Sequence, residues 1–322
     1  MSEYVGRLEL TWTNKALRLL AHEDGQYEWV SAADFRVAEV RLLDDVTSVG
    51  EVNSDRAKDN LLIRGDALNA LRSLARLPQF AREYLGKVKL AYLDPPFNTQ
   101  QSFLQYDDAL EHSVWLTMIR DRLIQIRDLL ADDGSVWLHL DDSEVHRARS
   151  VMDEVFGAES FIGTVIWNKT DTLRNDARRF SVSHDYLLVY GSLTWTARRL
   201  PRTTEMQLAY KNPDGDPRGP WLPGTLISPQ FRKSGDFIVE TRGGAVHRAP
   251  AGTSWRVPRD TFDRLVAANR IWFGRDGRGT PQQKLFLANA KDRVVDTIWD
   301  VKDVGGNRQS KVESKKLFPE AL

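Results

Sequence analysis

The sequence contains no cysteine among its 322 residues. This absence excludes disulfides, thiolate nucleophiles, cysteine-based zinc sites and iron–sulfur clusters. It also suits a reducing cytosol, and we expect a cytoplasmic protein. No apolar stretch reaches the roughly 18 residues that cross a membrane. The first residues, MSEYVGRLELTW, contain no basic segment followed by an apolar run, so no secretory signal is predicted.

Charged residues are abundant but unevenly distributed. The chain carries 45 Lys and Arg against 45 Asp and Glu. Residues 1–160 hold 18 basic and 28 acidic side chains, residues 161–290 hold 20 and 11, and residues 291–322 hold 7 and 6. A basic middle segment is typical of a site for a polyanion such as nucleic acid. A random imbalance of the solvated surface is the alternative.

The length predicts about two domains. From residue 61 onward, short apolar runs alternate with segments of helical periodicity. We predict strands at 61–64, 87–93, 135–140, 161–167 and 185–190, and helices at 67–77, 111–130 and 142–156. This alternation indicates an α/β domain over 61–193 with a doubly wound parallel sheet. Ligands of such sheets bind beyond the carboxyl ends of the strands, where Asp66 and Asp94 are expected.

The flanking segments differ in character. Residues 1–60 form an N-terminal extension, with a strand and then a short helix over 8–19. Residues 194–286 are rich in Arg, Gly, Pro and Trp, and they predict an inserted module of small β and mixed content. Residues 287–322 are interpreted as a connecting segment.

The most informative motif is Asp94-Pro95-Pro96-Phe97, which directly follows the apolar run 87–93. Two prolines cannot extend a strand, and they fix the backbone in a rigid loop. The loop presents a carboxylate, free carbonyls and an aromatic ring, which suit a planar amine. The carboxylate and a proline carbonyl can each accept one amine hydrogen, and the ring can stack on the attached heterocycle. A turn with a capping aspartate and a core phenylalanine is the alternative.

An ordered series of segments extends this motif along the chain. It comprises NLLIRGDALNAL at 60–71, KVKLAYLDPPFNTQ at 87–100, GSVWLHLDDSE at 134–144, FGAESFIGTVIWNK at 156–169, HDYLLVYG at 184–191, YKNPDGDPRGPW at 210–221 and WRVPRDTFDRLVAANRIWFGRDGRG at 255–279. In these segments the chain resembles amino-directed DNA methyltransferases of the β-class, and more narrowly the site-specific adenine methyltransferases that are modification subunits of type III restriction–modification systems.

The resemblance implies methyl transfer from S-adenosylmethionine to N6 of adenine at a specific sequence of double-stranded DNA, with no metal. It implies that Asp94 holds the target amino group, that Pro95 offers its carbonyl to the second hydrogen, and that Phe97 stacks on the flipped base, with Pro96 in the same rigid loop. Asp66 corresponds to the acidic residue that accepts from the cofactor's adenine amino group; an N-cap for the helix 67–77 is its alternative. The module 194–286 corresponds to the target recognition module.

Several other residues have ordinary structural alternatives. His139, Asp141 and Asp142 could suggest a metal cluster, but a strand histidine and acids at a helix start are favoured. His184 is either near the site or on the surface. Three residues after the catalytic loop could shape its pocket or form a plain turn (Tyr106, Asp107 and Asp108). Two arginine pairs could meet phosphate or lie on a solvated face (Arg178-Arg179 and Arg198-Arg199).

One family motif, a glycine-rich loop of the form D-x-F-x-G-x-G that cradles the methionine part of the cofactor, is not found. Gly305-Gly306 after Asp303 lacks the aromatic residue and the preceding strand. From the resemblance we therefore expect an incomplete methyltransferase sheet. A second polypeptide could supply the loop, the chain could be truncated, or it could act only as a DNA-binding recognition subunit that is inactive alone. A restriction subunit and homo- or hetero-oligomerisation through an exposed sheet edge are further expectations.

Overall fold

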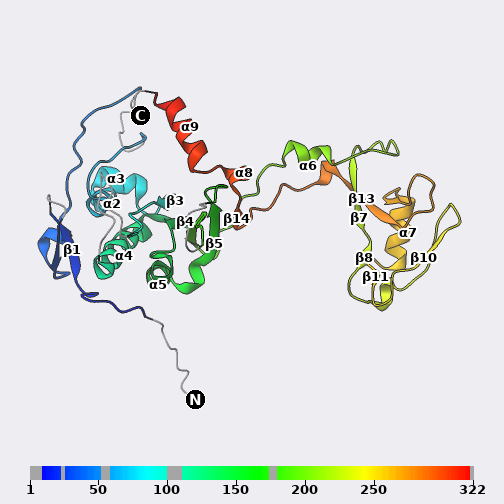
Figure 1. The fold of residues 1–322 in the computed structure, drawn as a ribbon, viewed down its shortest axis with the longest axis horizontal. Helices are drawn as coiled ribbons and strands as arrows, with labels where there is room; N and C mark the ends of the chain where they lie inside the picture. The colour runs from blue at the N-terminus through cyan, green and yellow to red at the C-terminus, as the bar shows by residue number, and fades with distance from the viewer. Residues whose placement is uncertain (1–8, 23–25, 52–58, 100–110, 174–179, 320–322) are drawn as a thin grey trace, which may run out of the picture. The chain divides into compact units, whose positions relative to one another are not determined.

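In the computed structural model, the described residues are 9–22, 26–51, 59–99, 111–173 and 180–319. The chain divides into two compact units (Figure 1). The first comprises Met1–Thr196 together with Asp296–Leu322, and the second comprises Ala197–Val295. Within the described residues, no helix is long and apolar enough to span a membrane.

A five-stranded sheet forms the centre of the first unit. Its strand order is β14-β5-β6-β4-β3, with bounds Ile298–Trp299 for β14, Phe161–Asn168 for β5, His184–Gly191 for β6, Leu130–Leu140 for β4 and Val88–Leu93 for β3. The predicted α/β class is confirmed, but the expectation of a parallel sheet is wrong, because β6 is antiparallel to both β4 and β5. The link from β5 to β6 contains no helix in its described part, and an antiparallel pair needs no helical crossover.

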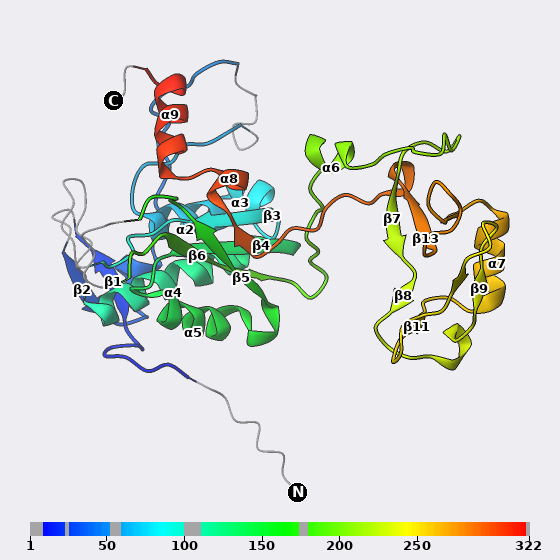
Figure 2. The ribbon, with the colours of Figure 1, turned by 45° about the vertical axis from the view of Figure 1, so that its right-hand side comes forward.

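One face of this sheet carries the main apolar core. Three helices contribute to it, namely α2 (Ala67–Arg76), α4 (His112–Leu129) and α5 (Val145–Phe156). Helices α4 and α5 lie side by side along this face (Figure 2). Trp115, Ile119 and Leu123 of α4 recur at helical spacing and are at most 1% exposed. Burying each such side chain stabilises the fold by roughly 1.5–3 kcal/mol.

The opposite face of the sheet carries the alternate residues of each strand. Val136 and Leu138 of β4 belong to the main core, whereas Trp137 packs in a smaller cluster with Val165 and Val189. Strand β3 lies at the edge of the sheet, and its side chains on this face, Leu90 and Tyr92, are 56% and 53% exposed.

The segments before β3 differ from the sequence predictions. The described part of the predicted segment 8–19, residues 9–19, does not form a strand followed by a helix. Instead β1 (Arg18–Ala21) and β2 (Tyr27–Val30) form an antiparallel hairpin, followed by α1 (Phe35–Ala38). The predicted strand 61–64 is also wrong. Its Leu62 is 91% exposed, and no neighbouring strand among the described residues supplies a ladder partner. Helix α2 ends before Pro78, as its sequence predicts, and α3 (Pro78–Tyr84) follows.

The second unit consists of short strands around a small core. Strands β12 (Ile271–Trp272), β13 (Gln282–Phe286) and β7 (Trp221–Thr225) form one antiparallel sheet. Two further pairs join β8 (Ile227–Ser228) to β11 (Ser254–Trp255) and β9 (Val239–Glu240) to β10 (Val246–His247). The helices are α6 (Thr204–Leu208) and α7 (Arg259–Ala267), and the buried core is formed by Leu226, Val239, Trp255, Phe262 and Ile271.

This unit contains almost all of the segment 194–286 and extends to Val295. The residues after it, which we expected to be only a connection, return to the first unit. There, β14 pairs in parallel with β5, and α8 (Val301–Val304) and α9 (Asn307–Leu317) follow. Short 3₁₀ turns complete the chain at Ala158–Ser160, Lys233–Gly235 and Leu287–Asn289.

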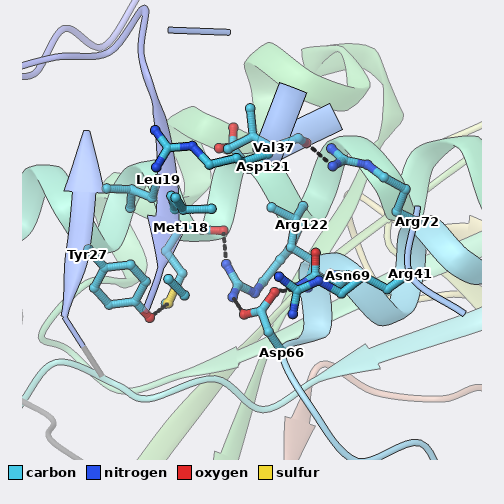
Figure 3. A pocket seen from close by; sticks show the side chains of 14 residues that line it. Leu19, Tyr27, Val37, Arg41, Asp66, Asn69, Arg72, Met118, Asp121 and Arg122 are labelled. Carbon is cyan, nitrogen blue, oxygen red and sulfur yellow. Dashed lines mark hydrogen bonds and ion pairs between the residues drawn. The ribbon is translucent and has the colours of Figure 1, made fainter. Parts of the chain in front are cut away.

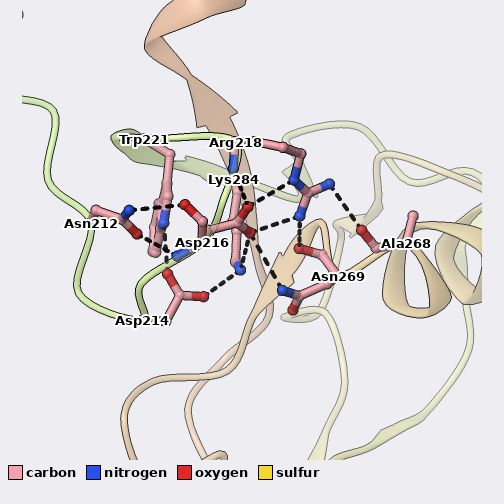
Figure 4. A network of polar contacts seen from close by, with 8 residues as sticks. All are labelled: Asn212, Asp214, Asp216, Arg218, Trp221, Ala268, Asn269 and Lys284. Atoms are coloured by element: carbon pink, nitrogen blue, oxygen red, sulfur yellow. Dashed lines mark hydrogen bonds and ion pairs between the residues drawn. The ribbon is translucent and has the colours of Figure 1, made fainter.

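A buried ionic network ties the second unit together (Figure 4). Lys284 on β13 is 1% exposed and contacts the carboxylates of Asp214 and Asp216, with 2.9 Å between its Nζ and Asp216 Oδ2. Arg218 donates to Asp216 and to the carbonyls of Ala268 and Asn269 at the end of α7. Hydrogen bonds from Arg218 lower the pKa of Asp216, and Lys284 adds to the effect.

Candidate active site

The loop Asp94–Phe97 follows β3 at its carboxyl end. In the parallel register Leu93 pairs with Leu138, so Asp94 and His139 are the next residues on the two strands. The indole Nε1 of the fully buried Trp115 donates to the Pro96 carbonyl at 2.7 Å. Asn98, in a left-handed conformation with φ 61°, donates its side-chain amide to Glu144 Oε1 at 2.7 Å. The loop is thus held from both α4 and the residue that precedes α5.

Four charged groups form a row that ends in this loop. We call it the charged row, and it consists of Lys169, Asp185, His139 and Asp94. Lys169 Nζ lies 2.7 Å from Asp185 Oδ1, and Asp185 Oδ2 lies 3.3 Å from His139 Nε2. His139 Nδ1 lies 3.3 Å from Asp94 Oδ1 and 3.1 Å from the Tyr92 hydroxyl. Charges of opposite sign therefore alternate along the row.

Contacts within the row shift the pKa values of His139 and Asp185. Burial opposes the charged form of His139, but hydrogen bonds to Asp185 and Asp94 outweigh it and raise the pKa of His139 to about 9. Burial also opposes the charge on Asp185, yet hydrogen bonds from His139 and Lys169 lower the pKa of that carboxyl. The pKa of Tyr92 is raised by burial and by the charges of Asp94 and Asp185. His139 and Asp185 are therefore both ionised at neutral pH.

Aromatic rings and the charged row enclose a cleft of about 620 Å³. The rings of Phe97 and Trp167 stand edge-on to the His139 imidazole, at centroid distances of 5.0 and 5.5 Å. The cleft is lined by Asp94, Pro95, Pro96, Phe97, Thr99, His139, Trp167, Lys169, Asp185 and Asn307. Its volume is within the range of about 300–1,000 Å³ that is usual for small-molecule sites. The four residues predicted to be catalytic are therefore brought together at one cavity.

Asp66, predicted to bind the cofactor, lies elsewhere (Figure 3). It is the N-cap of α2: its Oδ1 accepts from the backbone N–H groups of Leu68 and Asn69 at 2.9 and 3.2 Å, and its Oδ2 is paired with Arg122. The cavity beside it measures about 20 Å³, room for about one water, and shares no lining residue with the cleft. The capping alternative is confirmed, and the expectation that Asp66 follows a strand is wrong.

The other candidates have structural partners. Asp141 accepts from the backbone of Ser143, and the Tyr186 hydroxyl donates to Asp142 and lies 2.9 Å from His184 Nε2. Among the described residues no group of three or more side chains is arranged to hold a metal ion. Arg199 donates to the Asp292 carbonyl. The remaining candidates lie outside the described residues (Tyr106, Asp107, Asp108, Arg178 and Arg179).

Sequence reasoning did not place six residues in the cleft: Thr99, His139, Trp167, Lys169, Asp185 and Asn307. Strand pairing brings four of them together. Trp167 pairs with Asp185 between β5 and β6, and Leu140 pairs with Tyr186 between β4 and β6, which places His139 and Asp185 at one end of the sheet. The one local feature that indicated the position of His139 is the alternation in WLHL. This alternation puts His139 on the face of the sheet opposite the buried leucines.

Comparisons with known proteins identify the family. The sequence profile of the DNA methylase family, which covers N6 and N4 methyltransferases, matches residues 88–322. The chain is 30% identical to the type III restriction–modification enzyme StyLTI Mod subunit of Salmonella typhimurium over 292 residues, covering 80% of this chain and 43% of the relative. It is 29% identical to the type II methyltransferase M.EcaI of Enterobacter cloacae over 262 residues, covering 77% of this chain and 55% of the relative.

Solved structures give a weaker similarity. A DNA modification methylase of Thermus thermophilus in complex with S-adenosylmethionine aligns with 47% of this chain and 62% of its own, at 16% identity and a TM-score of 0.28. The chain spans about half the length of the curated relatives it matches. Since the family profile covers most of the chain and includes the Asp94 loop, the chain belongs to the DNA methylase family.

Proposed function

We propose that this chain methylates the exocyclic N6 of adenine in double-stranded DNA, with S-adenosylmethionine as the methyl donor. The observation that carries the proposal is the rigid loop Asp94–Phe97, which lines the cleft at the carboxyl end of β3. Family membership and restriction–modification relatives support the reaction class.

The loop supplies hydrogen-bond acceptors and an aromatic surface. The Asp94 carboxylate would accept one hydrogen of the adenine amino group, and the Pro95 carbonyl would accept the other, since no hydrogen bond within the described residues engages it. Phe97 offers a ring on which a flipped base can stack, which offsets part of the few kcal/mol that unstacking costs. Asp94, Pro95 and Phe97 would localise the amine lone pair and align it with the incoming methyl group.

S-adenosylmethionine supplies an electrophilic methyl group on its sulfonium when bound. The described residues around Asp66 do not form a pocket of its size, because both carboxylate oxygens are engaged and the adjacent cavity holds about one water. A role for Asp66 in cofactor binding therefore stays a prediction.

We expect Asp66→Ser to separate capping from cofactor binding. Serine caps a helix about as well as aspartate, so only the lost ion pair with Arg122 should lower the thermal stability. The carboxylate that could accept from the cofactor's adenine is lost. If Asp66 binds the cofactor, titration calorimetry with S-adenosylmethionine should show an affinity at least about tenfold weaker.

Asp34→Ser is the matched control, because Asp34 caps α1 in the same way and should leave cofactor affinity unchanged. An unchanged affinity in Asp66→Ser would assign Asp66 to helix capping alone.

The second unit is the proposed DNA-recognition module. Residues 197–295 hold 18 Lys and Arg against 9 Asp and Glu. Many of these arginines are paired: Arg248 with Asp236, Arg259 with Asp263 and Arg264 with Asp260. An arginine that is paired with an aspartate has less positive charge available to bind a DNA phosphate.

Three exposed arginines without a side-chain partner in the described residues lie on two adjoining turns. Gly243 N donates to the Gly277 carbonyl at 3.3 Å, and a Cβ atom on Gly243 would lie 2.9 Å from that oxygen, so the two backbones touch. These turns carry Arg242, Arg275 and Arg278. We propose that they contact the DNA backbone.

We expect the triple variant Arg242→Ala, Arg275→Ala, Arg278→Ala to weaken duplex DNA binding. Each lost phosphate contact should reduce the slope of log affinity against log salt by about 0.9. Fluorescence anisotropy across a salt series measures that slope.

The control triple variant Arg248→Ala, Arg259→Ala, Arg264→Ala removes the same charge from paired positions. Its slope should fall less than that of the turn variant. Equal slopes in the two triples would exclude the turns as the phosphate contact.

The partners of the whole protein are also proposals. The restriction–modification relatives favour action beside a restriction subunit. We also propose that a second polypeptide completes the cofactor site. Strand β3 lies at the edge of the sheet, and we propose that subunits assemble along it.

A further inference from the structure

We infer that His139 is a positioning residue for methyl transfer, which as a doubly protonated imidazolium fixes the Asp94 carboxylate at the mouth of the cleft. The inference rests on the proposed function and deepens it. It assigns a role to a side chain that the sequence alone favoured as an ordinary strand histidine.

The side chains around His139 favour a proton on both ring nitrogens. Asp185 faces Nε2 and Asp94 faces Nδ1, each at 3.3 Å. A neutral imidazole donates from only one nitrogen. If it donated from Nε2 to Asp185, Nδ1 could accept from the Tyr92 hydroxyl at 3.1 Å, but the ring would carry no charge to hold Asp94. Two carboxylates facing opposite nitrogens of a ring that is 9% exposed favour the imidazolium.

The surroundings of His139 are consistent with a cation. Strand β3 contributes the Tyr92 hydroxyl, the following loop contributes Asp94, and β6 contributes Asp185. On the far side of Asp185, Lys169 contacts the second oxygen of that carboxylate, Oδ1. The other described residues that line the cleft are uncharged. Each charge in the row therefore has a neighbour of opposite sign.

The consequence for Asp94 is a fixed carboxylate. Its side chain is 64% exposed, and His139 is its one ion-pair partner among the described residues. An exposed aspartate without that partner would sample several rotamers in water. With Oδ1 held by His139, Oδ2 is left to accept the hydrogen of a substrate amine. His139 acts through Asp94 and does not need to touch the substrate.

Two substitutions at position 139 test the inference in methylation assays. Gln places its amide nitrogen near the former Nε2 and loses the contact with Asp94, whereas Asn places its amide near Nδ1 and keeps a neutral donor to Asp94. We expect kcat to fall about 10- to 100-fold in His139→Gln and less in His139→Asn, with KM for DNA unchanged. His184→Gln is the matched control, because His184 bonds Tyr186 and does not line the cleft.

The pH dependence of kcat distinguishes the proposed role of His139 from a purely structural one. Because the pKa of His139 is raised to about 9, its charge is complete near pH 7 and is lost as pH rises through 9. The kcat of the unaltered chain should therefore fall above about pH 9, and this alkaline limb should be absent in His139→Gln. A kcat that is unchanged in His139→Gln, or a limb that persists in it, would overturn the inference.

Histidine NMR separates this inference from the proposed function. In ¹⁵N-histidine-labelled protein, one imidazole should titrate near pH 9, and Asp94→Asn, at an exposed position, should lower that pKa by about one unit or more. Titration near 6.5, or no response to Asp94→Asn, would overturn the inference whatever the activity. A titration near 9 in a chain that methylates nothing would overturn the proposed function instead.

Discussion

Asp94→Ala should abolish methyl transfer while DNA binding persists. The carboxylate is the acceptor that holds the target amine, and loss of one positioned hydrogen-bonding group at a reacting centre typically costs about 10²–10³-fold in rate. The side chain is 64% exposed, so its removal leaves no cavity in the core and the protein should fold. Incorporation of labelled methyl groups into duplex DNA measures the loss, and anisotropy measures the binding.

Asp133→Ala provides the control for Asp94→Ala. Asp133 is comparably exposed and paired with Lys89, but it lies near the start of β4, away from the loop. Its loss should leave the rate unchanged. If Asp94→Ala methylates as fast as the control, Asp94 does not hold the target amine.

Lys284→Met should unfold the second unit selectively. The substitution keeps the length of the side chain but leaves Asp214 and Asp216 facing each other without their shared cation. Removing one partner of a buried ionic group typically costs 3–5 kcal/mol, and because Arg218 still compensates Asp216 we expect about 3 kcal/mol. Amide hydrogen exchange of β7 and β13 should rise strongly, while the main sheet stays protected.

Arg264→Ala is the comparison for this loss of stability. Arg264 and Asp260 form an exposed i, i+4 pair with 75% and 77% of their side chains accessible, so their interaction contributes little. Exchange in Arg264→Ala should match that of the unaltered chain. If Lys284→Met behaves like Arg264→Ala, the network does not hold the unit together.

The parts of the site that could be predicted are those encoded locally. The four residues Asp94-Pro95-Pro96-Phe97 predict the end of a strand and a rigid turn. They also predict two hydrogen-bond acceptors, the Asp94 carboxylate and a proline carbonyl. Helix α4 likewise follows from the spacing of Trp115, Ile119 and Leu123. Its prediction at 111–130 agrees with the observed bounds of His112–Leu129 to within one residue at either end.

The parts that could not be predicted depend on pairing between distant segments. The sequence favoured His139 as an ordinary strand histidine. Its place beside Asp94 and Asp185 depends on the pairing of β4 with β3 and β6, because both carboxylates are about 45 residues away in the chain. The antiparallel direction of β6 has no local signature in HDYLLVYG, which reads as a buried strand in either direction. Residues 61–64 were wrongly predicted to form a strand. An apolar run forms a strand only where a neighbouring strand can pair with it.

The most direct test of the account is the identity of the methylated base. The purified chain is incubated with duplex DNA and S-adenosylmethionine labelled in its methyl group, and the nucleosides released by digestion are separated by mass spectrometry. We predict N6-methyladenine in the unaltered protein and in Asp133→Ala, and none in Asp94→Ala. Label on a ring carbon, or no label from a chain that binds both DNA and the methyl donor, would contradict it.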